Sequence, residues 1–253
     1  MPRESSRRSL PGLTKASGYI AHPFDLAHGV RTSGLVAGRY LKTEHAHSRH
    51  ATACYAVAPS VFREIVRRWR RTRPAAAMAE TTFIDVGAGM GRAVLLASEL
   101  GFERVLGVEL HPKLARVAGR NLAIWRRARR AICPARMVHA DILELKWPAG
   151  PAVLFLFNPF GAVVMRRLLR AVARGFAGRG GELDILYVNN EQESEIEAQP
   201  GFTRLWSGRV FRSREDAAAD RRILLSQPDA EYAAPAHEDC SIWRWMGKAG
   251  SRE

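Results

Sequence analysis

The stretch Phe83-Ile84-Asp85-Val86-Gly87-Ala88-Gly89-Met90-Gly91 decides the fold of this chain of 253 residues. An apolar segment ends in an acid, three alternate glycines follow, and a second apolar segment begins after Arg92, which predicts a strand, a tight turn and a helix. Glycine suits such a turn because it adopts positive φ angles and lets a ligand approach the backbone. A carboxylate just before the glycines suits a ligand that carries an ammonium group and a sugar. The spacing Gly-x-Gly-x-Gly also differs from the Gly-x-Gly-x-x-Gly fingerprint of nicotinamide and flavin enzymes.

Strand and helix patterns alternate over residues 81–190, which predicts a doubly wound α/β fold with a mostly parallel sheet. Ligands of such sheets bind at the carboxyl ends of the strands. A single acid at a strand end also serves as a helix cap, but polar residues that recur in successive units favour a binding site. The expected strands are 82–86, 104–109, 137–142, 152–157 and 183–188, with Asp85, Glu109, Asp141, Asn158 and Asn189 at their ends, and an antiparallel pair, 202–211 and 241–246, completes the sheet.

The glycine run and these strand ends resemble the class I S-adenosylmethionine-dependent methyltransferases. The resemblance covers residues 80–190 and implies a Rossmann-like, seven-stranded sheet with an antiparallel C-terminal strand and S-adenosyl-L-methionine as cofactor. It implies that Asp85 orients the methionyl end, that Glu109 accepts hydrogen bonds from the ribose hydroxyls, and that Asp141 meets the adenine amino group. The cofactor-binding residues that it implies are Asp85, Gly87, Ala88, Gly89, Gly91, Glu109, Leu110, Asp141, Ile142 and Asn158. The whole chain resembles a group of uncharacterised bacterial members, through residues 29–34, 158–161 and 241–245.

The segment Asn158-Pro159-Phe160-Gly161 resembles the Asp/Asn-Pro-Pro-Tyr/Phe loop of enzymes that methylate planar amino groups. In that loop the amide side chain and a proline carbonyl hold the target nitrogen in line with the methyl group. This chain has Phe160 in place of the second proline and Gly161 in place of the aromatic residue. Asn158 is therefore a candidate catalytic residue for N-methylation, and the alternative is a turn that closes over the cofactor.

The N-terminal part contains His45, His47, His50 and Cys54, a loose match to a zinc-binding pattern, and no metal is expected. Residues 1–18 are predicted to be a disordered basic tail, 19–75 a cap segment and a helix, and 76–250 the methyltransferase domain. The cap is expected to wrap over the cofactor and to help form the substrate pocket. Tyr40, Tyr55 and the histidines are candidate pocket residues.

Composition bears on the partners and the location of the protein. The formal net charge of +14 is consistent with arginine-rich, solvated helix faces and also with a polyanionic partner. There is no long apolar run and no secretory signal, and the three cysteines are scattered, so we expect a cytoplasmic protein without a membrane partner. Near the C-terminus, Asp216, Asp220 and Glu238 are expected to be solvated, whereas Glu191 and Glu193 are better candidates for binding a substrate.

These patterns favour methyl transfer to an unidentified acceptor: a small molecule, a protein or a nucleic acid, with nitrogen among the atoms considered. No side chain stands out as an obligatory base, and the oligomeric state stays open. Two alternatives remain. One is a nicotinamide-dependent oxidoreductase, which the glycine spacing disfavours; the other is a non-catalytic, cofactor-binding subunit that binds RNA or a protein.

Overall fold

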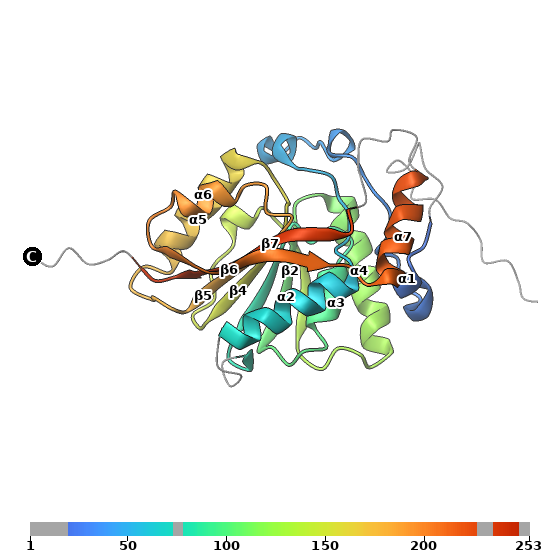
Figure 1. Ribbon diagram of the computed structural model, residues 1–253, viewed down its shortest axis with the longest axis horizontal. Coiled ribbons are helices and arrows are strands. Elements are labelled where there is room, and N and C mark those ends of the chain that lie inside the picture. The colour runs from blue at the N-terminus through green and yellow to red at the C-terminus, as the bar shows by residue number, and fades with distance from the viewer. Residues whose placement is uncertain (1–19, 73–77, 227–234, 248–253) are drawn as a thin grey trace, which may run out of the picture.

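The computed structural model describes residues 20–72, 78–226 and 235–247 (Figure 1). The predicted tail, residues 1–18, lies outside the described residues. Seven strands form one sheet in the order β3-β2-β1-β4-β5-β7-β6. Strand β7 is antiparallel to β5 and to β6, while β1 to β5 pair in parallel. This arrangement confirms the predicted Rossmann-like fold. The strands are β1 Thr82–Val86, β2 Arg104–Glu109, β3 Ala135–His139, β4 Ala152–Phe157, β5 Leu183–Val188, β6 Phe202–Phe211 and β7 His237–Trp245.

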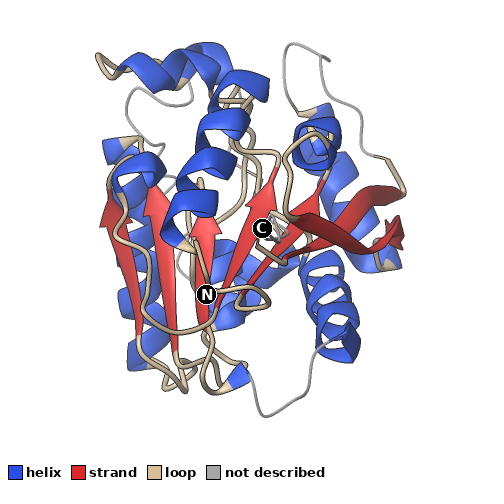
Figure 2. Ribbon diagram, turned by 90° about the vertical axis from the view of Figure 1, so that its left-hand side faces the viewer, coloured by secondary structure: helices blue, strands red, loops and turns tan. Residues whose placement is uncertain are grey.

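The helices cover both faces of the sheet (Figure 2). Apolar side chains of α2, α3 and α4 pack against one face, and those of α5 and α6 pack against the other. The central strands β1, β4 and β5 are buried almost throughout, because they are covered from both sides. The helices are α1 Pro23–His28, α2 Pro59–Thr72, α3 Arg92–Ala97, α4 Pro112–Arg127, α5 Ala162–Gly175, α6 Glu193–Glu197 and α7 Arg214–Leu225, with short 3₁₀ helices η1 Gly38–Tyr40, η2 Ala46–His50 and η4 Ile142–Glu144. None of the described helices combines the length and the apolar character needed to cross a membrane.

Helix α2 belongs to the sheet's own core. Its apolar stripe includes Phe62 and Trp69, which are 0% and 1% exposed, as the helical spacing predicts. The Trp69 indole N–H donates to the Asp184 carboxylate of β5 at 2.7 Å. Trp243 and Trp245 of β7 are also buried, in the apolar cluster that includes α5 and α6. Phe62 and Trp69 thus join α2 to one face of the sheet, while the two β7 tryptophans pack on the other face.

Two element boundaries differ from the sequence prediction. Strand β3 ends at His139, and Asp141 is the N-cap of η4, with its carboxylate accepting from the Leu143 N–H at 2.9 Å. The side chain thus stops the strand early, which apolar periodicity does not reveal. Strand β7 begins at His237, four residues before the expected start at Ser241, because its polar first residues pair with the end of β6.

The later part of the N-terminal segment, with η1 and η2, runs along the upper edge of Figure 1, whereas α1, in darker blue, lies at the right beside α7. The strip after η2 lines the cavity at the carboxyl ends of the strands. Antiparallel bridges join Val36 to Cys54 and Ala51 to Phe160. The segment is therefore fixed to the loop after β4, directly above the place where a doubly wound sheet binds ligands.

Candidate functional site

The first cavity lies at the carboxyl ends of β1 and β2, around the glycine turn. Gly87 and Gly89 have φ angles of +70° and +55°, a region that side chains other than glycine rarely adopt. A Cβ on Gly87 would lie 2.7 Å from the Pro159 Cβ, and one on Gly89 would lie 2.9 Å from the Cys54 Sγ. The glycines therefore allow both the turn and the close approach of its covering segments. The predicted residues that line this cavity are Asp85, Gly87, Ala88, Gly89, Gly91, Glu109, Leu110, Asp141 and Ile142.

The Asp85 side chain lines the first cavity. It is 4% exposed, and no described residue donates a hydrogen bond to its side chain. Burial, with a contribution from the Glu109 carboxylate, raises the pKa of Asp85 to about 8. A buried carboxyl group of this kind is stabilised in its ionised form by an ammonium group placed beside it.

Glu109 is held in one orientation by two backbone donors. The Gly89 N–H and the His111 N–H each donate to one of its carboxylate oxygens at 2.7 Å. Burial raises the pKa of Glu109, and these hydrogen bonds oppose the rise. Each carboxylate oxygen keeps a second lone pair, so the group can accept from a pair of neighbouring hydroxyls without losing its support.

Asp141 lies at the far side of the same cavity, beneath the cap segment. Its second oxygen accepts from the His47 Nδ1 at 2.5 Å, and the His45 Nε2 is 3.7 Å away. The Arg167 guanidinium lies 2.5 Å from the His47 Nε2, and because it can only donate, Nε2 accepts and Nδ1–H donates to Asp141. Both ring nitrogens of His47 are thus engaged.

Two histidines of the loose zinc-binding pattern, His45 and His47, lie beside Asp141. The three side chains of His45, His47 and Asp141 converge within 4.8 Å, whereas Cys54, the last residue of the loose pattern, lies against Gly89. Burial of the thiol, together with the Glu109 charge, raises the pKa of Cys54 to about 12, so the thiol stays protonated. Neither Cys54 nor His50 belongs to this cluster, so the four residues of the loose sequence pattern do not converge.

Sequence reasoning missed the ion pair that fastens the cap segment. Arg92 is 3% exposed and donates to the Thr32 and Ser33 hydroxyls at 2.7 and 2.9 Å. The Asp25 carboxylate accepts from both of those residues and lies 3.7 Å from the guanidinium. This contact accounts for the Thr-Ser of the N-terminal motif. The available signal was a lone arginine at the start of an otherwise apolar helix.

The strip Ala51–Val57 covers the first cavity. The Thr52 N–H donates to the Pro159 carbonyl at 3.3 Å, and the Thr52 hydroxyl donates to the Asn158 carbonyl. The free volume beneath the strip is about 110 Å³. Ligand pockets commonly measure about 300–1,000 Å³. The strip must therefore move for a nucleoside-sized ligand to enter.

A second cavity, of about 700 Å³, lies on the other side of this strip. Asn158 lines it, while Pro159 and Phe160 line the first cavity, so the structure separates Asn158 from the other predicted cofactor-binding residues. The backbone turns at this point because Asn158 has a φ of +40°. Tyr55 lines both cavities, whereas Tyr40 is 53% exposed and lines neither.

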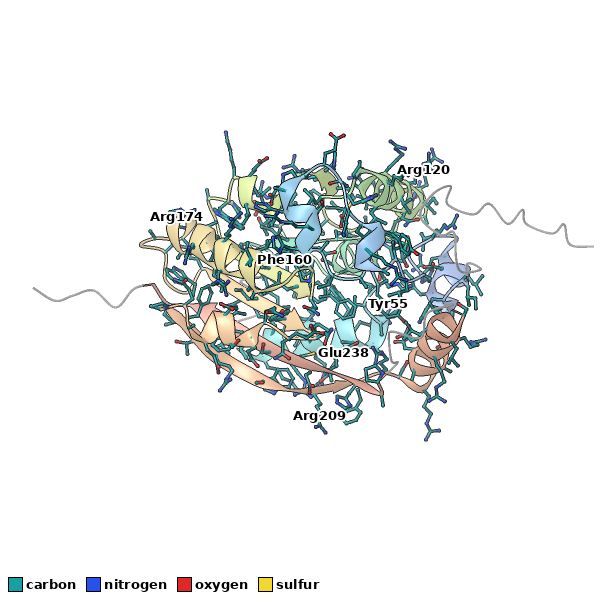
Figure 3. All side chains as sticks on the ribbon, turned by 90° about the horizontal axis from the view of Figure 1, so that it is seen from above. Tyr55, Arg120, Phe160, Arg174, Arg209 and Glu238 are labelled. Carbon is teal, nitrogen blue, oxygen red and sulfur yellow. The ribbon has the colours of Figure 1, made fainter. Side chains whose placement is uncertain are left out.

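The expectation of solvated acids near the C-terminus is wrong. Asp216, Asp220 and Glu238 are 6%, 0% and 7% exposed. The His22 Nε2 lies 3.4 Å from Asp216 and 3.9 Å from Asp220, which places α7 against the N-terminal segment. Arg212 lies 3.0 Å from Asp220 and also donates to Glu238. Glu238 and Glu191 line the second cavity, and Glu193 does not. In Figure 3, Tyr55, Phe160 and Glu238 lie in the central part of the view, while Arg120, Arg174 and Arg209 lie nearer its edges.

Comparisons with known proteins concern the architecture. No family model matches the chain, and no curated protein matches its sequence. Among solved structures, the cyclase SpnF has 14% identity and a TM-score of 0.49, over 76% of this chain and 82% of that one. An RNA methyltransferase from Salinibacter ruber, in complex with S-adenosyl-L-homocysteine, has 16% identity and a TM-score of 0.42, over 75% and 94%. A mutant of MtNAS in complex with S-adenosylmethionine has 13% identity and a TM-score of 0.45, over 74% and 62%.

Structural similarities with such low sequence identities and TM-scores do not identify a substrate. The fold itself is settled by the strand order and the antiparallel β7. The chain has the Rossmann-like, seven-stranded architecture of the class I methyltransferases.

Proposed function

We propose that this protein transfers a methyl group from S-adenosyl-L-methionine to an acceptor. The observation that carries the proposal is the pair of buried carboxylates, Asp85 and Glu109, on either side of the positive-φ glycine turn. Register places them on adjacent parallel strands, because Asp85 lies opposite Gly107 of β2, two residues before Glu109. A buried acid that lacks a donor and a second acid that backbone N–H groups hold in place fit an ammonium group and a ribose diol.

The donor set of the first cavity fits the cofactor along its length. Asp85 would hold the ammonium group, Glu109 the ribose hydroxyls and Asp141 the adenine amino group. The bound cofactor supplies a methyl group that is already activated on a sulfonium, so the protein's contribution is orientation and exclusion of water. Asp141 would bind adenine only if it shares its second oxygen with His47.

The oxidoreductase alternative has weaker support. The Gly89 N–H donates to Glu109, and the N–H groups of Gly87 and Ala88 donate to the Val108 carbonyl, so these amides are not free for the pyrophosphate of a dinucleotide. A non-catalytic cofactor-binding subunit remains the second candidate, since it would use the same first cavity. Methyl transfer to any acceptor excludes it.

Thermal unfolding with S-adenosylhomocysteine tests the cofactor assignment, with NADH as the control ligand. A ligand at about 100 times its Kd should stabilise the protein by about 2.7 kcal/mol, which raises Tm by roughly 5–11 °C in a chain of this size. Asp85→Ala and Glu109→Ala should abolish the rise, while Glu80→Gln, an exposed acid just before β1, should keep it. A rise with NADH alone, or none with either ligand, would sink the methyltransferase assignment.

A further inference from the structure

The segment between Glu109 and Asp141 holds most of the excess positive charge of the chain. It contains eight lysine and arginine residues and no acid, so it carries +8 of the formal net charge of +14. The rest of the chain, although equally rich in arginine, carries only +6, because acids balance most of its cations. The segment comprises α4, β3 at the edge of the sheet and the loop between them.

Four of these cations form a row on the solvent-facing side of α4. Lys113, Arg116, Arg120 and Arg127 are all exposed, and at about 3.6 residues per turn they lie within about 60° of one another around the helix axis. The row is about 21 Å long, since each residue adds about 1.5 Å to a helix. The apolar residues of α4 are buried on its other side. These four residues are called the α4 row below.

The α4 row has no acidic partner within the part of the chain that the structure describes. None of its four side chains forms an ion pair with a described carboxylate. Two neighbouring arginines differ in this respect. Arg130 lies 3.3 Å from Glu99, with its guanidinium carbon 5.0 Å from the centre of the Trp125 ring, and Arg126 donates to the Ala135 carbonyl. The α4 row is therefore free to bind an anion from outside the chain.

The stability of α4 does not explain the cations at its two ends. Its first turn contains Lys113 and no acid, although the helix dipole favours acids there. At the other end, the Arg130 N–H donates to the Trp125 carbonyl at 3.1 Å and the Arg129 N–H to the Arg126 carbonyl at 2.9 Å, as in a Schellman motif. Arg129 has a φ of +54° at the position of this motif where glycine is usual. At both ends a different residue would stabilise the helix more.

The chemistry of this face fits the phosphate groups of a nucleic-acid duplex. Each strand of a duplex has one phosphate per about 3.4 Å of helix axis, so the α4 row faces about six phosphates of one strand. Lysine binds phosphate as a point charge, and arginine binds it with two hydrogen bonds.

Two other kinds of partner fit this face less well. Trp125 is the only tryptophan, tyrosine or phenylalanine of the segment, and it is 1% exposed. The face therefore lacks the aromatic side chains on which single-stranded nucleic acids stack. A helix that lies on a membrane surface inserts an apolar side into the lipid, and the apolar side of α4 is buried in the protein.

We infer that the α4 row, with Arg129 at its end, binds the sugar–phosphate backbone of double-stranded nucleic acid without reading its bases. None of these five residues lines either cavity. The inference therefore goes beyond methyl transfer and does not depend on it. Because only phosphates are contacted, DNA and RNA duplexes of any sequence should bind with similar affinity.

Fluorescence anisotropy with a labelled DNA duplex of about 20 base pairs tests the inference. The wild type should bind with a Kd of about 10⁻⁴–10⁻⁶ M at physiological salt, the range of non-specific binding. The logarithm of the association constant should fall linearly with the logarithm of the salt concentration, with a slope of about −4 for four or five phosphate contacts. A second duplex of unrelated sequence should give the same values, and a single strand of equal length should bind more weakly.

A matched pair of variants separates the location of the charge from its amount. Arg120→Gln should weaken duplex binding roughly tenfold at about 0.1 M salt and reduce the size of the slope by about one. Arg174→Gln removes the same charge from an exposed position of α5, and it should bind the duplex as the wild type does. Figure 3 shows Arg120 and Arg174 toward opposite ends of the molecule. Both variants should keep the Tm of the wild type.

Arg129→Gly gives a readout in which stability and binding change in opposite directions. Glycine relieves the left-handed backbone strain, so Tm should rise by about 2–4 °C. Loss of the guanidinium should at the same time weaken duplex binding and reduce the size of the salt slope by about one. A purely structural arginine would change Tm and leave the slope unchanged.

Four results would overturn the inference: no duplex binding at about 50 mM salt, an equal loss of binding in Arg120→Gln and Arg174→Gln, tighter binding to the single strand than to the duplex, or binding to vesicles that contain phosphatidylserine without binding to the duplex. Failure to bind S-adenosylhomocysteine counts instead against the proposed function and leaves this inference standing.

Discussion

The pKa of Asp85 predicts that the affinity for S-adenosylhomocysteine rises with pH. In the free protein this pKa is about 8, because the carboxyl group is buried and near Glu109. The ligand's ammonium group favours the ionised form, so binding lowers the pKa and releases a proton at any pH below 8. Between about pH 6 and about pH 7.5 the ionised fraction of such a group grows from about 0.01 to about 0.24, which corresponds to about 24-fold tighter binding, or about 1.9 kcal/mol.

Isothermal titration calorimetry measures this effect directly. Repeating the titration in buffers of different ionisation enthalpy should give a release of about 0.9 proton near pH 7. Adenosine, which lacks the homocysteine part and its ammonium group, should bind with an affinity that does not follow this slope, and Asp85→Asn should remove the slope for S-adenosylhomocysteine. An affinity that is flat with pH in the wild type, or an equal slope in Asp85→Asn, would refute the assignment of Asp85 to the ammonium group.

Three further predictions concern stability. The folded pKa of Asp85 is raised from 3.8 to about 8, so the group costs stability as pH rises through this window, and Asp85→Asn should stabilise the ligand-free protein by up to about 4 kcal/mol near pH 7 but hardly at all near pH 4, as urea unfolding will show. Gly87→Ala should destabilise by about 2 kcal/mol or more because of its φ and the Pro159 contact, whereas Gly119→Ala, in α4 with open space around it, should stabilise by about 0.5–1 kcal/mol; equal effects would contradict the geometry. Arg92→Ala should cost about 3–5 kcal/mol and make residues 20–58 sensitive to limited proteolysis, and a variant as resistant as wild type would show that the ion pair does not hold the segment.

The sheet and the first cavity could be predicted because their signals are local. The strand, turn and helix around Asp85 follow from apolar runs and glycines within a few residues of one another, and Glu109 repeats the same strand ending. These patterns also fix which side chains meet, since parallel strands bring their carboxyl ends to one edge. Asp141 was placed at the correct edge, although it caps a 3₁₀ helix and does not extend the strand.

The second cavity could not be predicted, because it depends on contacts between distant parts of the chain. Near it, Asp216 and Asp220 belong to a polar helix that looks solvated, and their burial depends on the packing of α7 near His22 and Ser60, distant in sequence. Glu238 is at the start of a strand whose polar beginning has no apolar alternation. Charge pairing leaves no periodic trace in a sequence, so nothing in the pattern around Arg212 distinguishes it from the other arginines of a basic chain.

The strip Ala51–Val57 forms part of the wall of both cavities, so we expect binding in one cavity to change the binding free energy in the other. Residues 51–53 and Tyr55 face both cavities, so a ligand that packs against one side of the strip fixes the wall that the other ligand meets. The two binding equilibria then share a coupling free energy, and reciprocity requires that each ligand change the affinity of the other by the same factor.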